Sequence, residues 1–92
     1  MMSQLPIFLE KVGKKALDME ILRASMIAEL DAINLYEQFA AATNNKLLKK
    51  VLLDIAKEEK THVGEFQALL LEIDKEQTRE LRKGKKEVEE LK

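Results

Sequence analysis

Two residues one helical turn apart, Glu59 and His62, have the types and the spacing of metal ligands. His62 is the only histidine in the sequence, and apolar residues surround the pair at helical spacing. Side chains three residues apart lie on the same face of a helix. Placing a carboxylate and an imidazole on an inward face is costly unless they are paired or bound to a metal ion. The pair therefore predicts a functional site on this face.

Two long helices are predicted to carry this face and a partner face, over residues 14–43 and 46–73. Each has an apolar stripe with spacings of three and four residues, which predicts a coiled-coil-like seam. Polar breaks in the two stripes occur only at Glu29, Glu59 and His62. The stripe of the first helix is Leu22, Met26, Glu29, Ile33, Tyr36 and Ala40, and that of the second is Leu48, Leu52, Ile55, Glu59, His62, Phe66, Leu69 and Ile73.

The connection between the two helices sets the relative heights of the polar breaks. Asparagine caps helices and tolerates turn conformations, so Asn44 and Asn45 predict a tight turn. Such a short connection makes the helices antiparallel. Glu29 lies about 15.5 residues before the middle of the turn and Glu59 about 14.5 after it, at a rise of about 1.5 Å per residue. The two carboxylates are therefore expected at nearly the same height, with His62 within one turn of both.

The ends of the chain differ from the helical hairpin. Residues 1–13 contain several apolar side chains and are expected to form an N-terminal arm, with Gly13 as the boundary before the first helix. Residues 75–92 are rich in charge and are predicted to form a shorter helical segment. Gly84 is expected to end or kink a helix within this segment.

Composition excludes several classes of function. The sequence has 92 residues, 46% of them apolar and 36% charged, with a net charge of -1. The lack of a basic excess argues against a nucleic-acid partner. The absence of cysteine excludes disulfides, zinc fingers and rubredoxin-type iron sites. No apolar run approaches the roughly 20 residues that cross a bilayer, and no signal peptide is recognised. We expect a soluble, cytoplasmic protein of one domain.

A second copy of the chain would complete both the core and the site. A chain of this size has a weak core alone, so oligomerisation is expected. Two hairpins would build a four-helix bundle with four carboxylates and two imidazoles inside it. This is the ligand inventory of di-iron carboxylate bundles, in which Glu-x-x-His is a recurring motif. Iron, manganese and zinc all accept such ligands.

Two segments resemble the encapsulated ferritins, half-size members of the ferritin-like superfamily. They are Ala28-Glu29-Leu30-Asp31-Ala32-Ile33-Asn34-Leu35-Tyr36-Glu37 and Glu58-Glu59-Lys60-Thr61-His62. The resemblance covers residues 18–91 and is strongest to the archaeal form fused to an encapsulin shell protein. It implies an all-α fold, in which a long antiparallel two-helix hairpin with a short C-terminal helix dimerises into a ferritin-like four-helix bundle. A free-standing subunit and a domain excised from a shell fusion both fit the sequence.

The resemblance also implies an activity. The family is expected to act as a ferroxidase that binds two Fe(II) ions between the subunits of a dimer and oxidises them with dioxygen. Glu29, Glu59 and His62 would be the metal ligands. Tyr36 would lie beside the metal site, and Asp31 would line the approach to it. The expected assembly is a homo-oligomeric ring of five dimers, inside a nanocompartment made by an encapsulin shell protein that stores the iron.

Two other functions fit the same residues. One is a rubrerythrin-like di-metal peroxidase or a manganese protein, although the chain has no cysteine for a rubredoxin electron donor. The other is a non-enzymatic helical module that serves only in oligomerisation. Metal content separates the second from the enzymes, and turnover with peroxide or dioxygen separates the first from a ferroxidase. A metalloprotease is excluded because one histidine cannot supply the His-Glu-x-x-His motif.

Overall fold

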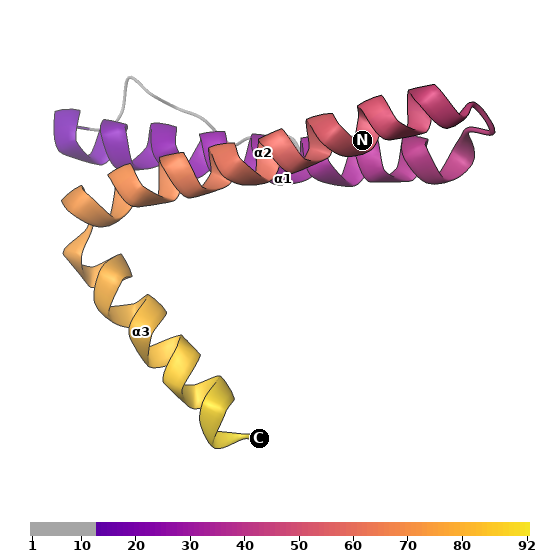
Figure 1. The fold of residues 1–92 in the computed structure, drawn as a ribbon. Coiled ribbons are helices and arrows are strands. Elements are labelled where there is room, and N and C mark those ends of the chain that lie inside the picture. The colour runs from indigo at the N-terminus through magenta and orange to yellow at the C-terminus, as the bar shows by residue number, and fades with distance from the viewer. Residues whose placement is uncertain (1–12) are drawn as a thin grey trace.

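The computed structural model describes residues 13–92, which form three helices: α1 (Lys14–Ala42), α2 (Lys46–Ile73) and α3 (Lys75–Glu90). α1 and α2 run side by side as an antiparallel hairpin, and α3 leaves the open end of the hairpin in a different direction (Figure 1). No strand is present among these residues. The prediction of an all-α chain with a helical hairpin and a shorter C-terminal helix is confirmed. The predicted N-terminal arm lies, apart from Gly13, outside the described residues.

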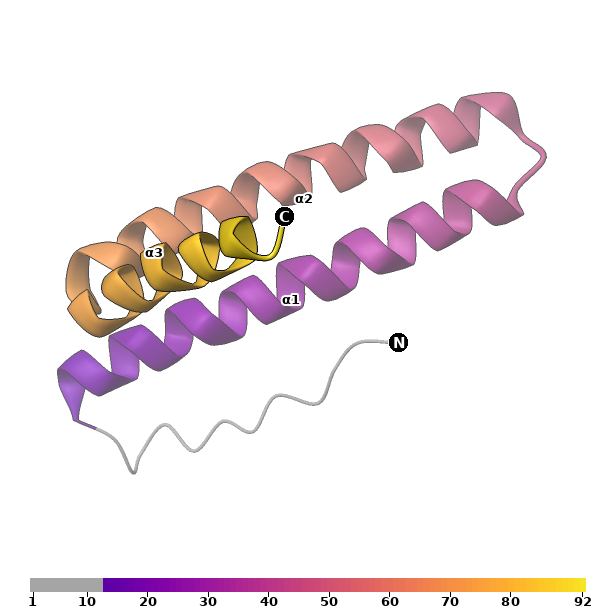
Figure 2. The ribbon, with the colours of Figure 1, turned by 90° about the horizontal axis from the view of Figure 1, so that it is seen from below.

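The turn between α1 and α2 is closed by the side chains of Thr43 and Asn45 and by one backbone hydrogen bond. The backbone N–H of Thr43 donates to the Phe39 carbonyl (3.1 Å), which ends α1 one residue earlier than expected. The Asn45 side-chain oxygen accepts the Leu48 backbone N–H (2.9 Å) and caps the start of α2. The Asn45 N–H donates to the Thr43 hydroxyl (3.1 Å). This compact turn holds the helices antiparallel along their length (Figure 2).

The core of the single chain is thin. Its buried apolar side chains, within the described part, are Ile33 and Ala40 of α1 and Ala56 and Leu70 of α2. Leu48 and Leu69, two members of the predicted stripe of α2, are instead exposed. α2 is therefore rotated so that one edge of its apolar surface packs on α1 and the other edge is open. No helix in residues 13–92 has the length and apolar character that crossing a bilayer demands.

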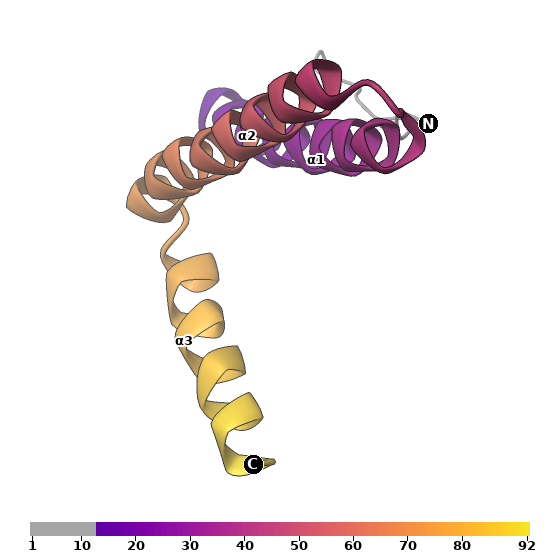
Figure 3. The same cartoon turned by 45° about the vertical axis from the view of Figure 1, so that its right-hand side comes forward.

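α3 is a single helix that passes through Gly84 (Figure 3). The prediction that Gly84 ends a helix is wrong. An isolated glycine costs a helix only about 1 kcal/mol relative to alanine. The residues around Gly84 are mostly lysine, arginine, glutamate and leucine, which all favour helices, and they outweigh that cost. The large apolar side chains of this segment, Leu81, Val88 and Leu91, are exposed.

Replacing Gly84 by alanine is expected to stabilise α3 by about 1 kcal/mol, because alanine has the higher helix propensity. A Cβ at this position meets no heavy atom within 4 Å, so no steric clash opposes the gain. Hydrogen exchange of the α3 amides should slow about fivefold. Lys85→Ala is the matched control and should change exchange little, because lysine and alanine differ by only a few tenths of a kcal/mol. Faster exchange in Gly84→Ala would contradict the prediction.

Candidate metal centre

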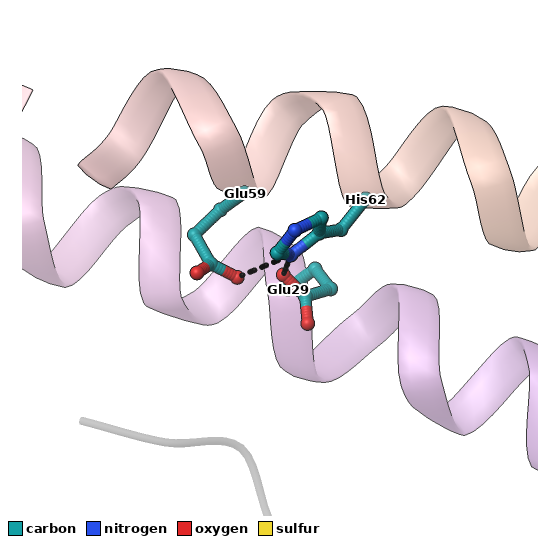
Figure 4. Close-up of side chains that lie close together, drawn as sticks. All are labelled: Glu29, Glu59 and His62. Atoms are coloured by element: carbon teal, nitrogen blue, oxygen red, sulfur yellow. Dashed lines mark hydrogen bonds and ion pairs between the residues drawn. The ribbon is translucent and has the colours of Figure 1, made fainter. Parts of the chain in front are cut away.

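Three side chains from two helices converge halfway along the hairpin (Figure 4). Glu29 projects from α1, and Glu59 and His62 project from α2. His62 Nδ1 lies 3.3 Å from Glu29 Oε2 and 3.5 Å from Glu59 Oε2. One potential ligand atom from each of the three residues lies within 4.8 Å of the others. The structure thus brings together the three residues that break the apolar stripes.

The local structure explains this convergence. Glu59 and His62 are three positions apart within α2, so the helix alone places them on one face. Glu29 joins them because the tight turn brings the middle of α1 beside the middle of α2. The Lys60–Glu37 ion pair (3.0 Å) also joins the two helices near this level. Hairpin register and helix periodicity together therefore position the site.

The distances from His62 Nδ1 to the two glutamate oxygens suit a shared metal ion. With metal–ligand bonds of about 2.1 Å, neighbouring ligand atoms lie about 3.0 Å apart in an octahedral site and about 3.4 Å apart in a tetrahedral one. The observed separations of 3.3 Å and 3.5 Å are close to these values. Two carboxylate oxygens and one imidazole nitrogen suit iron, manganese and zinc. The donor set and its spacing therefore fit a transition metal.

Proton balance also favours a cation at this position. A proton on His62 Nδ1 can be donated well to only one of the two neighbouring carboxylates at a time. A metal ion in the same place would contact both carboxylates and the imidazole together. The imidazole must lose its Nδ1 proton to bind the ion, so binding would release a proton unless the nitrogen is already bare. A cation at this position would therefore satisfy all three side chains at once.

The group is open on one side. The exposed fractions of the side chains are 20% for Glu29, 19% for Glu59 and 45% for His62. In the part of the chain that is described, no further histidine, aspartate or glutamate joins this group of three. Leu22, seven residues before Glu29, and Leu69, seven after His62, line one shallow depression. Seven residues are about two helical turns, so Leu22 lies on the same face of α1 as Glu29, and Leu69 on the same face of α2 as His62. We call the surface formed by these five residues the metal face.

The other two residues implicated by sequence lie on α1, outside this group. Tyr36 is half-buried and is seven residues, or two turns, beyond Glu29. Asp31 is also half-buried. Within the site, His62 contacts Glu29 and Glu59. The roles of Tyr36 and Asp31 stay predictions.

Sequence reasoning missed an ion pair at the open end of the hairpin. Arg23 of α1 contacts Asp74, the residue between α2 and α3, with 2.7 Å between Arg23 Nη2 and Asp74 Oδ2. The signal available in the sequence was Asp74 followed three residues later by Gln77, a spacing typical of a helix start. It predicts the cap of α3 but not the partner on α1.

Comparison with known proteins extends these findings. The family model described as EncFtn-like matches residues 7–90. A ferritin-like–encapsulin shell fusion protein of Pyrococcus furiosus is 62% identical over 73 residues, which are 79% of this chain and 21% of that protein. The encapsulin nanocompartment cargo protein EncC of Myxococcus xanthus is 38% identical over 79 residues, which are 83% of this chain and 61% of that protein. The chain therefore spans only part of each curated relative.

The fold has a match among solved structures. The crystal structure of the encapsulated ferritin domain from Pyrococcus furiosus superposes with a TM-score of 0.84 at 53% identity. The match covers 99% of this chain and 93% of the other. Family model, relatives and fold agree, and they confirm the resemblance seen in the two helical segments. The chain belongs to the EncFtn-like family of encapsulated ferritins.

Proposed function

We propose that two copies of this chain form a ferroxidase, which oxidises Fe(II) to Fe(III) with dioxygen at a di-iron site between them. The observation that carries the proposal is the convergence of Glu29, Glu59 and His62 on an open, apolar-edged face of the hairpin. Membership of a ferritin-like family supports a role with iron. Iron is here the substrate, which enters as Fe(II) and leaves oxidised.

Charge balance favours a site shared by two copies. One chain offers two carboxylates and one imidazole, and two chains related by a two-fold axis offer twice as many. Two divalent ions then balance four carboxylates that could not otherwise share an apolar interior. Pairing the metal faces would also cover Leu22 and Leu69 and produce a four-helix bundle.

The chain's own residues would bind the iron and stabilise its oxidised form. Glu29 and Glu59 supply anionic oxygen, which stabilises Fe(III) more than Fe(II) by simple Coulomb attraction. His62 supplies the nitrogen ligand once its Nδ1 is unprotonated. Two iron ions supply two electrons, the number that reduces one dioxygen molecule to hydrogen peroxide with the uptake of two protons. In this proposal Tyr36 hydrogen-bonds a ligand carboxylate, and Asp31 attracts cations to the approach.

The setting we propose is an encapsulin nanocompartment in the cytoplasm. One relative carries its ferritin-like part fused to an encapsulin shell, and the other is a cargo protein of such a compartment. The proposed partner is therefore an encapsulin shell protein, which would enclose the oxidised iron for storage. The proposed assembly is a ring of five dimers, with the metal-linked dimer as its functional unit.

Mass spectrometry of the intact protein with and without Fe(II), under anaerobic conditions, tests the site. We expect two iron ions per dimer and a shift from monomer to dimer on iron addition, because a ligand that links subunits favours assembly. At a free metal concentration of 100 times Kd, the stabilisation is about 2.7 kcal/mol. Admitting dioxygen should then convert the bound iron to Fe(III).

Two outcomes would contradict the proposal. A dimer that forms with no stoichiometric metal would favour a purely structural helical module. Faster turnover with hydrogen peroxide than with dioxygen would favour a di-metal peroxidase. Zn(II), which has the same charge but no redox chemistry, is the control. It should drive dimer formation without consuming dioxygen.

A further inference from the structure

The joint between α2 and α3 is a single buried acidic residue. α2 ends at Ile73 and α3 begins at Lys75, so Asp74 alone connects them. Asp74 is 8% exposed, and among residues 13–92 it is the one polar residue that is buried. Its Oδ1 accepts the backbone N–H of Gln77 (2.9 Å), and its Oδ2 accepts the Arg23 guanidinium (2.7 Å). One carboxylate thus contacts α3 with one oxygen and α1 with the other.

Few other contacts hold α3 against the hairpin. The Thr78 hydroxyl donates to the carbonyl of Leu71 (2.9 Å) and lies 3.2 Å from that of Asp74. Leu81 lines a groove with Leu30 and residues of α2, on the side of the hairpin away from the metal face. Figure 1 shows α3 projecting away from the two long helices. The direction of α3 therefore depends on very few side chains near its first turn.

We propose that the Arg23–Asp74 pair sets the direction in which α3 leaves the hairpin. Backbone rotation at one connecting residue would otherwise leave α3 free to swing about the end of α2. One carboxylate oxygen of Asp74 accepts the Gln77 N–H at the start of α3, and the other accepts the Arg23 guanidinium of α1. These two attachments restrain the rotation. The pair consequently decides where the exposed apolar side chains Leu81, Val88 and Leu91 lie relative to the metal face.

The two roles of Asp74 can be separated by substitution. Asparagine is as good a helix cap as aspartate, so Asp74→Asn keeps the cap of α3 while removing the charge that pairs with Arg23. Arg23→Met keeps the apolar length of the side chain and removes only the guanidinium. Both variants should therefore retain α3 as a helix and lose its fixed direction. Glu37→Gln is the matched control, because it breaks another ion pair between helices, the one with Lys60.

Pulsed electron resonance between two spin labels measures the direction of α3. The sequence has no cysteine, so cysteines introduced at the exposed positions Asn44 and Lys86 carry the only labels. Labelled full-length chains are diluted with unlabelled ones, so that only distances within one chain are recorded. We expect one narrow distance peak in the wild type and in Glu37→Gln. We expect loss of that peak to a broad distribution in Arg23→Met and Asp74→Asn, with unchanged helix content by circular dichroism.

The proposal fails if either Arg23→Met or Asp74→Asn keeps the narrow peak. In that case the Thr78 hydroxyl and the packing of Leu81 would be sufficient to hold α3. The two variants act on opposite members of the pair, so they must agree for the pair itself to be the cause.

Acid provides a second test that needs no substitution on α1. The Gln77 N–H and then the Arg23 guanidinium hold the pKa of the Asp74 carboxyl below its usual range. Because the folded pKa is lowered, the pair is complete above about pH 4 and is lost as the pH falls through the lowered value. Arg23 pairs with the ionised carboxyl and Lys15 of α1 adds a smaller attraction, so protonation of Asp74 removes both attractions. The wild-type peak should broaden on acidification, and Asp74→Asn should show no such change. An unchanged wild-type peak below the transition would overturn the proposal.

Discussion

Replacing Glu59 or His62 by alanine is expected to lower the rate of Fe(II) oxidation at least about 100-fold, since even residues that only orient ligands are worth about 10- to 100-fold. In the proposed site each residue supplies one of three ligand atoms, and a dimer would lose two ligands together. Helix content should stay close to that of the wild type, because both side chains lie at the partly exposed edge of the seam. Oxygen consumption and the absorbance of Fe(III) report the rate.

Glu58→Ala is the matched control for both substitutions. Glu58 precedes Glu59 on α2, has the same charge and chemistry, and is exposed on a different face of the helix. It should oxidise iron at the wild-type rate. If either Glu59→Ala or His62→Ala oxidises Fe(II) at the wild-type rate, the site does not take part in the reaction. An equal loss of oxidation rate in Glu58→Ala would indicate a general effect of acidic charge on iron uptake.

The convergence of the three ligands could be foreseen because it rests on short-range rules. Helix periodicity places Glu59 and His62 together, and the asparagine-rich turn brings Glu29 to the same height. Counting residues from the turn is reliable for two straight helices, since each residue adds a fixed rise. Those rules need no knowledge of the partner chain. The three residues predicted from the sequence are therefore the same three that converge in the structure.

The packing of the hairpin was harder to foresee. The apolar surface of α2 is wider than the stripe counted from sequence, and α1 covers the edge that contains Ala56 and Leu70. Leu48 and Leu69 lie on the edge left open. Periodicity shows that a helix is amphipathic but does not fix which edge meets which neighbour. Contacts such as Arg23–Asp74 join residues 51 positions apart, and no local pattern in the sequence signals such a pair.

Replacing Leu69 by lysine is expected to separate the two chains of the proposed metal-linked dimer. Leu69 is 52% exposed in the single chain and lies on the metal face, two turns beyond His62. In a two-fold dimer the substitution occurs twice, and each buried ammonium without a partner costs several kcal/mol. The dimer dissociation constant should rise at least about 100-fold, which corresponds to about 2.8 kcal/mol. Analytical ultracentrifugation measures the change, and iron oxidation should fall with it.

The comparison with Leu53→Lys decides which side of the hairpin meets the second copy. Leu53 is 47% exposed, close to the value for Leu69, but it lies beside Glu37 and Lys49 on the other side of the seam. The two variants add the same charge at similar exposure, so a general effect of lysine on stability would appear in both. Leu53→Lys should keep the iron-dependent dimer and its oxidation rate. If Leu53→Lys dissociates that dimer while Leu69→Lys does not, the second copy covers the opposite face. Glu29, Glu59 and His62 would then have no partner carboxylates with which to share two iron ions.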